Sequence, residues 1–246
     1  MQITTQALVI KVTDVGENDR LLTLLTKHNG IIKAFASNAK KINNKYYSAT
    51  SLFCFSDFTL RDVKGSYRVS DATLQHSFFK IGSDVEILSL CQYFCEVAEA
   101  LCPPDLDSEE LQRLILNIFH FIVTGKKSAA LLKAVFELRA LSISGFMPDL
   151  VGCLECGEFF ESEMYFYTDD GALRCKRCKL DNDKGIYLDA TLISAMRYIV
   201  YMDLEKLFSF EIPKEKAERL SKITEAFITS QTERRFRTLD FYYSLD

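Results

Sequence analysis

Four cysteines in two closely spaced pairs constrain this chain more than any other feature of its sequence. They follow the pattern Cys-x2-Cys-x18-Cys-x2-Cys and are Cys153, Cys156, Cys175 and Cys178. Two such pairs, each on a tight turn, can point four sulfurs at one ion, which is typical of a structural zinc site. The segment is too polar to build a core of its own, so bound metal would supply its folding energy. We therefore predict one structural Zn²⁺ in a zinc ribbon at about 150–180, with strands at 158–162 and 164–170 and a turn at 169–171.

Two chemically active alternatives use the same cysteines. A zinc deaminase needs Cys-x-Glu or His-x-Glu followed by Pro-Cys-x-x-Cys, and Cys153 with Glu155 resembles the first half. However, Cys156 would close the coordination position that a catalytic water needs, and Arg174 stands where the proline belongs. A redox-active Cys-x-x-Cys would need a thioredoxin-like βαβ setting, which the sequence does not offer. The structural site is therefore favoured.

The composition is that of an ordinary globular chain. Its 246 residues are 48% hydrophobic and 26% charged, enough apolar material for a core in one large or two modest domains. The longest apolar stretches fall short of the roughly 20 residues of a membrane span, and the first residues do not resemble a signal peptide. We expect a cytoplasmic protein without membrane contact, whose thiols stay reduced. The other four cysteines are then expected in the core: Cys54, Cys91, Cys95 and Cys102.

The hydrophobic period divides the chain near residue 80. Short runs with period two, separated by turn signals, predict five strands at 7–12, 20–27, 30–37, 51–63 and 65–76, and thus a small barrel or sandwich over 1–80. Apolar spacings of three and four then predict helices at 83–102, 107–125, 128–145, 189–202 and 213–231. We expect an α+β protein, in which residues 81–246 form an all-α domain interrupted by the zinc ribbon.

Charge is distributed unevenly between these two segments. Residues 1–80 hold 11 Lys and Arg against 6 Asp and Glu, whereas the remainder holds 19 against 28. A basic barrel with exposed aromatics suits single-stranded nucleic acid, because cations follow the phosphates and rings stack on bases. Tyr46 and Tyr47 are the candidate rings. The candidate DNA-binding cations are Arg20, Lys33, Lys40, Lys41, Lys45 and Arg68.

No motif for nucleotide or acyl chemistry supports an enzyme. The sequence lacks G-x-x-x-x-G-K-[ST], G-x-G-x-x-G and G-x-S-x-G. The histidines His28, His76 and His120 lie far apart and belong to no catalytic pattern. We expect a protein without catalytic residues.

Three segments together resemble the bacterial recombination mediator and DNA repair family RecO. The opening 7–41 is similar in its aliphatic strand, its Gly-Glu-Asn-Asp-Arg turn and its basic loop. Residues 136–157 resemble the family's passage from Phe-Glu-Leu-Arg through Gly-Phe-x-Pro to the first Cys-x-x-Cys, and 234–245 resemble its basic and aromatic ending. The resemblance follows the family's order along the whole chain.

This resemblance implies an OB-fold barrel followed by a helical domain that carries a zinc ribbon. It implies binding of single- and double-stranded DNA and annealing without ATP. It also implies cooperation with RecR in helping RecA replace single-strand DNA-binding protein, within the bacterial cytoplasm at the nucleoid. That protein's acidic C-terminal tail would need an apolar groove beside a cation, with Arg139 and Arg197 as candidates. A zinc-ribbon scaffold that binds only proteins is the alternative that the residues leave open.

Overall fold

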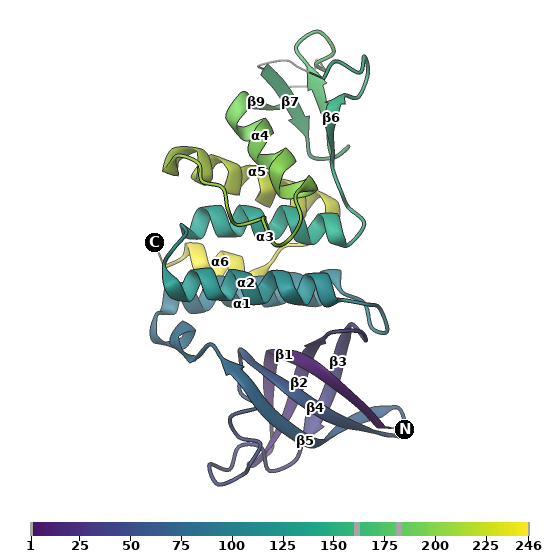
Figure 1. Ribbon diagram of the computed structural model, residues 1–246, viewed down its shortest axis with the longest axis vertical. Helices are drawn as coiled ribbons and strands as arrows, with labels where there is room; N and C mark the ends of the chain where they lie inside the picture. Colours follow the sequence, from purple (N-terminus) through teal and green to yellow (C-terminus); the bar gives the residue numbers. More distant parts are fainter. Residues whose placement is uncertain (1, 160–162, 181–183, 246) are drawn as a thin grey trace. The chain divides into compact units, whose positions relative to one another are not determined.

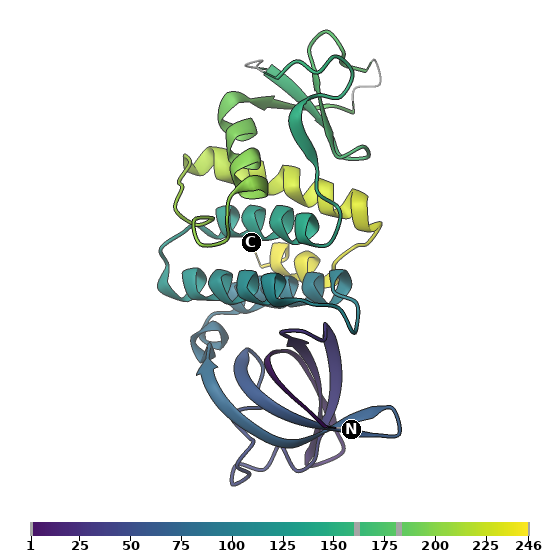
Figure 2. The ribbon, with the colours of Figure 1, turned by 45° about the vertical axis from the view of Figure 1, so that its right-hand side comes forward.

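The first part of the chain is a closed five-stranded barrel. The computed structural model describes residues 2–159, 163–180 and 184–245. The barrel strands are β1 (Gln2–Val15), β2 (Asp19–Thr26), β3 (Ile31–Ala36), β4 (Cys54–Val63) and β5 (Ser66–Ser77). They close in the order β1-β2-β3-β5-β4, with β3 and β5 parallel and the other pairs antiparallel. Figure 2 shows the strands curling round on themselves.

Alternation along the strands produces the barrel core. In β3 the residues Ile32, Ala34 and Ala36 point inward, whereas Lys33 and Phe35 between them point outward. Phe58 and other apolar residues from all five strands fill the same core. The period of two therefore separates a filled interior from an outer surface that is available to a ligand.

Helices complete the compact unit that holds the barrel. They are α1 (Val85–Leu101), α2 (Glu109–Thr124) and, from the chain's end, α6 (Arg237–Tyr243), preceded by the 3-10 helix Phe79–Ser83 (Figure 1). The buried Gln112 amide donates to the carbonyl oxygens of Gln6 at 3.2 Å and Leu25 at 2.8 Å. Phe119 lies edge-on to Phe53 at 5.2 Å between ring centroids.

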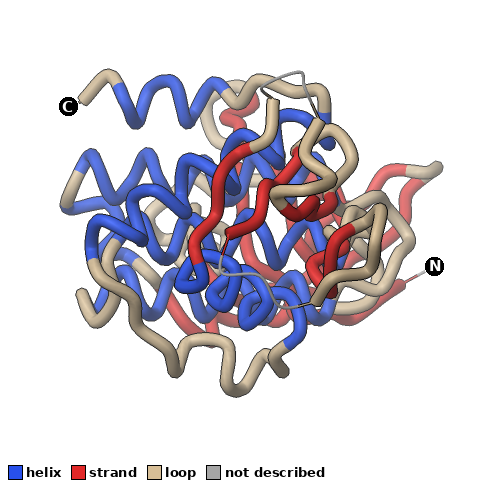
Figure 3. The backbone as a smooth tube through the Cα atoms, turned by 90° about the horizontal axis from the view of Figure 1, so that it is seen from above, coloured by secondary structure: helices blue, strands red, loops and turns tan. Residues whose placement is uncertain are grey.

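The second compact unit holds three further helices and a small sheet. The helices are α3 (Ala129–Ile143), α4 (Ala190–Tyr201) and α5 (Lys214–Thr232). The sheet, which we call the ribbon, has the order β6-β8-β7-β9 from β6 (Asp149–Cys153), β7 (Glu163–Tyr167), β8 (Ala172–Cys175) and β9 (Ile186–Asp189). Figure 3 colours the strands of the chain red and its helices blue.

The compact units group the elements differently from the two predicted segments. The first unit is Met1–Val123 with Phe236–Asp246, and the second is Thr124–Arg235. The helices α1, α2 and α6 thus belong with the barrel. The division at residue 80 as a boundary between independently folding domains stays a prediction.

The predicted fold class is confirmed: the chain has an OB-type barrel, then helices, with a cysteine cluster inserted. Two local predictions need correction. Glu158 and Phe159 lie outside any strand, and the rest of the strand expected at 158–162 lies outside the described residues. The helix α6 was not predicted, because its seven residues are too few to establish a helical period. In the described part of the chain no helix is both long and apolar enough to cross a membrane.

Candidate metal centre and nucleic-acid interface

The four cysteines of the two pairs lie together at one end of the ribbon. Their sulfur atoms are all within 4.8 Å of one another, and the Sγ atoms of Cys156 and Cys175 are 3.8 Å apart. Cys153 and Cys175 are buried, whereas Cys156 is exposed. Four sulfurs at this spacing can surround a single ion, which is the arrangement of a closed, tetrahedral structural site.

Backbone turns aim the thiols inward. The amide of Gly157 donates to the carbonyl of Cys153 at 2.9 Å, and the amide of Cys178 donates to that of Cys175 at 3.1 Å. Gly157 has a φ of +71°, a conformation that glycine adopts without strain. Each Cys-x-x-Cys is therefore a tight turn, as the spacing predicted.

The local field favours a thiolate in the cluster. Burial opposes ionisation of Cys153, yet backbone N–H groups at Cys175 and Cys156 lower the pKa of its thiol to about 6. Hydrogen bonds with Cys156 and Cys175 raise the pKa of Cys178 to about 12. Cys153 therefore ionises readily at neutral pH, whereas Cys178 keeps its proton. A cation would draw the remaining protons off, because the thiolate is the form that binds metal.

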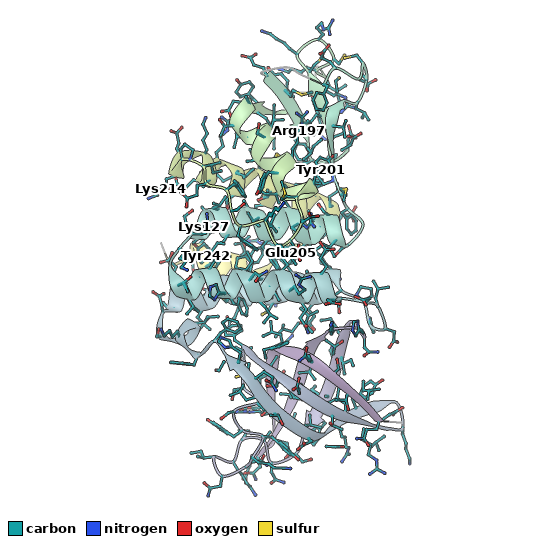
Figure 4. All side chains as sticks on the ribbon, viewed as in Figure 1. Lys127, Arg197, Tyr201, Glu205, Lys214 and Tyr242 are labelled. Atoms are coloured by element: carbon teal, nitrogen blue, oxygen red, sulfur yellow. The ribbon has the colours of Figure 1, made fainter. Side chains whose placement is uncertain are left out.

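Arg197 of α4 ties the first cysteine turn to the helices of its unit. Its guanidinium donates to the carbonyl oxygens of Leu150 at 2.6 Å and Val151 at 2.9 Å. It also lies over the ring of Phe159 at 4.7 Å. Figure 4 labels Arg197 and, one turn further along α4, Tyr201, whose hydroxyl accepts from the amide of Leu150 at 3.4 Å.

The two arginines proposed for an acidic peptide tail are both engaged inside the chain. Arg139 donates to the carbonyl oxygen of Val200 at 2.6 Å, at the C-terminal end of α4. Arg197 is held by the carbonyl oxygens near the cysteine turn. These contacts give each guanidinium a structural role, so neither marks a peptide groove, and the place where such a tail docks stays a prediction.

The six predicted DNA-binding cations all lie on the barrel unit but fall into two groups. Three are held by other groups of the protein. Lys40 pairs with Asp14 at 2.9 Å, and Lys45 pairs with Asp71 at 3.1 Å. The half-buried Arg20 donates through Nη1 to the 37–53 loop.

The remaining three predicted cations are more available. Lys33, Lys41 and Arg68 are exposed and form no ion pair with the residues that the structure describes. Lys33 and Arg68 stand on the outer surface of β3 and β5, whereas Lys41 lies in the loop. They are the better candidates for contact with an anion.

The register of the barrel places a row of side chains across its outer surface. Phe35 on β3 is paired with Leu21 on β2 and with Arg68 on β5, and Arg68 is paired with Arg61 on β4. Because residues paired in register point to the same face, these four side chains form one band, which we call the outer row. The guanidinium of Arg68 lies 5.6 Å from the centroid of the half-buried Phe35 ring.

The outer row contains three residues that the sequence did not single out: Leu21, Phe35 and Arg61. Phe35 shares the outward parity of Lys33, and Arg61 is paired with Arg68 across the hairpin of β4 and β5. The alternation of 31–36 was a signal for Phe35. The hairpin joins Phe35 only through the pairing of β5 with β3, which is distant in sequence and left no local signal.

The two loop tyrosines act chiefly as anchors. The Tyr46 hydroxyl donates to the carbonyl of Ser70 at 2.7 Å, and Lys45 lies over the Tyr46 ring at 4.6 Å. The Tyr47 ring is covered by Arg20 at 5.0 Å. Phe35 of the outer row is therefore a better candidate for stacking on a base.

Comparison with known proteins places the chain in one family over nearly its full length. Residues 1–78 match the family model described as Recombination protein O N terminal, and residues 82–240 match the one described as Recombination protein O C terminal. A protein named DNA repair protein RecO from Acetivibrio thermocellus is 30% identical over 98% of this chain and 96% of its own length. Proteins of the same name from Caldicellulosiruptor bescii and Clostridium perfringens are 26% and 28% identical, covering 98% and 97% of this chain and 97% and 96% of their own lengths. With both of its parts matched in order, the chain belongs to the Recombination protein O family.

Proposed function

We propose that this chain is a DNA repair and recombination mediator that binds single- and double-stranded DNA and anneals complementary strands without ATP. With RecR, it would assist RecA in loading onto DNA coated by single-strand DNA-binding protein. Membership of the Recombination protein O family supports the repair role. The observation that carries the DNA-binding part is the outer row, where an aromatic ring and two arginines share one barrel face.

The proposed mechanism needs charge and alignment, with no bond made or broken. Lys33, Arg61 and Arg68 lower the repulsion between phosphates, and Phe35 offers a ring on which an unstacked base can rest. Lys41 extends the positive surface into the loop. Bases held open in this way remain available for pairing with a second strand. We therefore propose a non-enzymatic protein that works in the cytoplasm at the nucleoid.

For the metal centre we propose one Zn²⁺ held by all four cysteines of the ribbon. The clustering of four sulfurs, with no carboxylate or histidine from the described residues among them, supports zinc over harder cations. A closed four-thiolate site leaves no position for water, so the ion would have a structural role. It would rigidify the first cysteine turn, which follows the strand β6 that Arg197 binds.

Salt-dependent DNA binding separates this proposal from a scaffold that binds only proteins. The test uses fluorescence anisotropy of a labelled single strand and compares the unchanged chain with the variant Lys33→Gln, Arg61→Gln, Arg68→Gln. This variant, which we call the outer-row variant, removes the two arginines of the outer row and the outward-facing Lys33 beside it on β3. The matched control is Lys80→Gln, Lys206→Gln, Lys222→Gln, which removes three exposed cations elsewhere.

We expect the outer-row variant to bind more weakly and its plot of log affinity against log salt to be shallower by about 2, because three phosphate contacts are lost. The control should keep most of the affinity. A chain that binds no oligonucleotide while still binding partner proteins would support the scaffold instead. Equal losses in both variants would remove the outer row from the proposal.

A further inference from the structure

One face of the ribbon carries three tyrosines that metal binding does not use: Tyr165, Tyr187 and the buried Tyr167, whose ring is covered by Arg174 at 4.8 Å. Tyr165 on β7 is paired in register with Arg174 on β8 and with Tyr187 on β9, so the three side chains share one face of the sheet. The neighbouring residue Phe166 points to the other face. It packs edge-on against Phe227 of α5 at 5.2 Å. Tyr165 and Tyr187 therefore lie on the opposite side of the sheet from Phe166. At the edge strand β9, Arg219 of α5 donates to the carbonyl oxygen of Tyr187 at 2.6 Å.

The rings of Tyr165 and Tyr187 are partly open to solvent, and each has a cation beside it. Tyr165 and Tyr187 are half-buried, with ring centroids 5.9 Å apart. The ammonium of Lys179 lies 4.9 Å from the centroid of Tyr165, and the guanidinium of Arg219 lies 5.5 Å from that of Tyr187. We call these four residues the tyrosine face.

Two acidic residues that the structure describes on this sheet face are compensated by neighbours. Asp189 and Glu163 are paired in register at the same end of β9 and β7. Asp189 binds Lys216 at 2.6 Å, and Glu163 approaches Lys176 at 4.0 Å. Each of these two carboxylates thus has a cation of its own beside it.

We propose that the tyrosine face is a second contact for single-stranded nucleic acid, separate from the outer row. Aromatic rings on adjacent strands of a sheet, with cations at their edges, match what such a ligand offers: flat bases and regularly spaced phosphates. Only an unpaired strand can bring its bases onto the rings. This inference rests on the proposed function, because the tyrosine face would give annealing a second DNA-binding surface, in the other compact unit of the chain.

Photo-crosslinking tests this contact directly on the full, zinc-loaded chain. A single strand that contains 5-iododeoxyuridine is bound, irradiated and mapped by mass spectrometry. The chain supplies its own controls, because Tyr201 and Tyr243 are 49% and 44% exposed but lie outside the tyrosine face. We expect adducts at Tyr165 or Tyr187 and few at the two control tyrosines. Adducts spread evenly over exposed tyrosines, or absent from the tyrosine face, would overturn the proposal.

Affinity measurements in the outer-row variant isolate the second surface. In that background, Tyr165→Leu with Tyr187→Leu should weaken binding of a labelled single strand about fivefold to tenfold, the loss expected when stacking is removed. Tyr165→Phe with Tyr187→Phe keeps the rings and should retain the affinity. Zinc content and melting temperature show that each variant still folds.

These experiments distinguish failure of the proposed function from failure of the tyrosine face alone. If the unchanged chain binds no oligonucleotide, the proposed function fails and this inference falls with it. If the unchanged chain binds but the Leu variant binds equally well, only the tyrosine face is refuted. A Leu variant that keeps its DNA affinity yet loses a partner protein would reassign the face to protein contact and so refute the proposal.

Discussion

At the residue scale, Arg20 holds the 37–53 loop against the start of β2. Its Nη1 donates to the Tyr47 carbonyl and the Thr50 hydroxyl at 3.2 Å each, and its guanidinium covers the Tyr47 ring. Asp19 also holds this loop, because its carboxylate accepts a hydrogen bond from the backbone amide of Asn38 at 2.7 Å. Arg20 therefore positions the loop that carries Lys41, and a direct contact with DNA is not needed to explain it.

Replacing Arg20 with lysine should loosen this loop. A lysine ammonium cannot reproduce the planar fork or cover the ring as a guanidinium does, so the free energy of unfolding should fall by about 1–3 kcal/mol. Hydrogen exchange at the amides of 47–51 should accelerate. Arg61→Lys is the control, because Arg61 is exposed and forms no hydrogen bond or ion pair within the described chain. Equal exchange in both variants would show that the Arg20 contacts do not hold the loop.

A buried ion pair in the second unit gives a sharper test of a single side chain. Lys133 is 2% exposed and lies 2.9 Å from the carboxylate of Glu137, which is fully buried and also accepts from the Thr224 hydroxyl at 2.6 Å. The same ammonium lies 2.7 Å from the carboxylate of the half-buried Glu225, so Lys133→Met leaves Glu137 and Glu225 without this cation. It should lower the free energy of unfolding by about 3–5 kcal/mol in chemical denaturation. Lys133→Met with Glu137→Met removes both charges and should recover most of the loss, whereas an additive loss would contradict a coupled pair.

At the element scale, the proposed zinc ion would stabilise the ribbon more than it would any helix. Cys153→Ser removes one of four proposed ligands and the thiol with the lowered pKa. We expect loss of bound zinc, measured by atomic absorption, and a lower melting transition for the second unit. The barrel should keep its affinity for single strands apart from the part contributed by the tyrosine face. A serine variant with one zinc per chain would rule out the four-cysteine site.

The stabilisation that Asp189 gives to the N-terminus of α4 should decrease as pH falls. Asp189 caps this helix through the amide of Leu192 at 3.0 Å, and although burial opposes its ionisation, Lys216 lowers the pKa of its carboxyl below 3.8. A lowered folded-state pKa means that the stabilisation is complete above the unfolded pKa and is lost as pH falls through the folded value. Asp189→Ala should cost about 0.5–2 kcal/mol at pH 7. The difference from the unchanged chain should shrink below pH 4, and a difference independent of pH would contradict this role.

Local signals predicted most elements because the capping residues are explicit in the sequence. Asp84, Ser128 and Asp189 each accept hydrogen bonds from the first turn of a helix, where the pattern placed the helix starts. The outer row and the tyrosine face arise from pairing between strands, so no single window of sequence contains them. Charge alone likewise could not separate Lys33, which faces outward, from Arg20, which binds the loop.

At the scale of the whole molecule, the end of the chain completes the first compact unit. Phe236 is buried and lies edge-on to Tyr93 of α1 at 5.5 Å. The amide of Thr238 donates to the Glu96 carboxylate at 3.1 Å, and Leu239 is also buried. A segment more than 110 residues away from α2 thus forms part of the same helical layer.

A chain that ends at Arg235 should therefore lose stability in the barrel unit. Removing α6 exposes the face of α1 that Phe236 and Leu239 cover, and burial of two large apolar side chains is worth about 3–6 kcal/mol. Thermal unfolding followed at both units should show a lower transition for the barrel unit and little change in zinc content. The single change Phe236→Ala should have a smaller effect in the same direction. An unaltered barrel transition in the truncated chain would contradict this account.

Strand annealing without ATP tests the central claim most directly. Two complementary oligonucleotides, each with one dye, are mixed with the chain, and energy transfer reports the duplex as it forms. We predict rapid annealing by the unchanged chain and by the Lys80→Gln, Lys206→Gln, Lys222→Gln control, with a marked loss in the outer-row variant. Failure of the folded, zinc-loaded chain to anneal, or annealing that survives loss of the outer row, would contradict an account in which this barrel face brings two strands together.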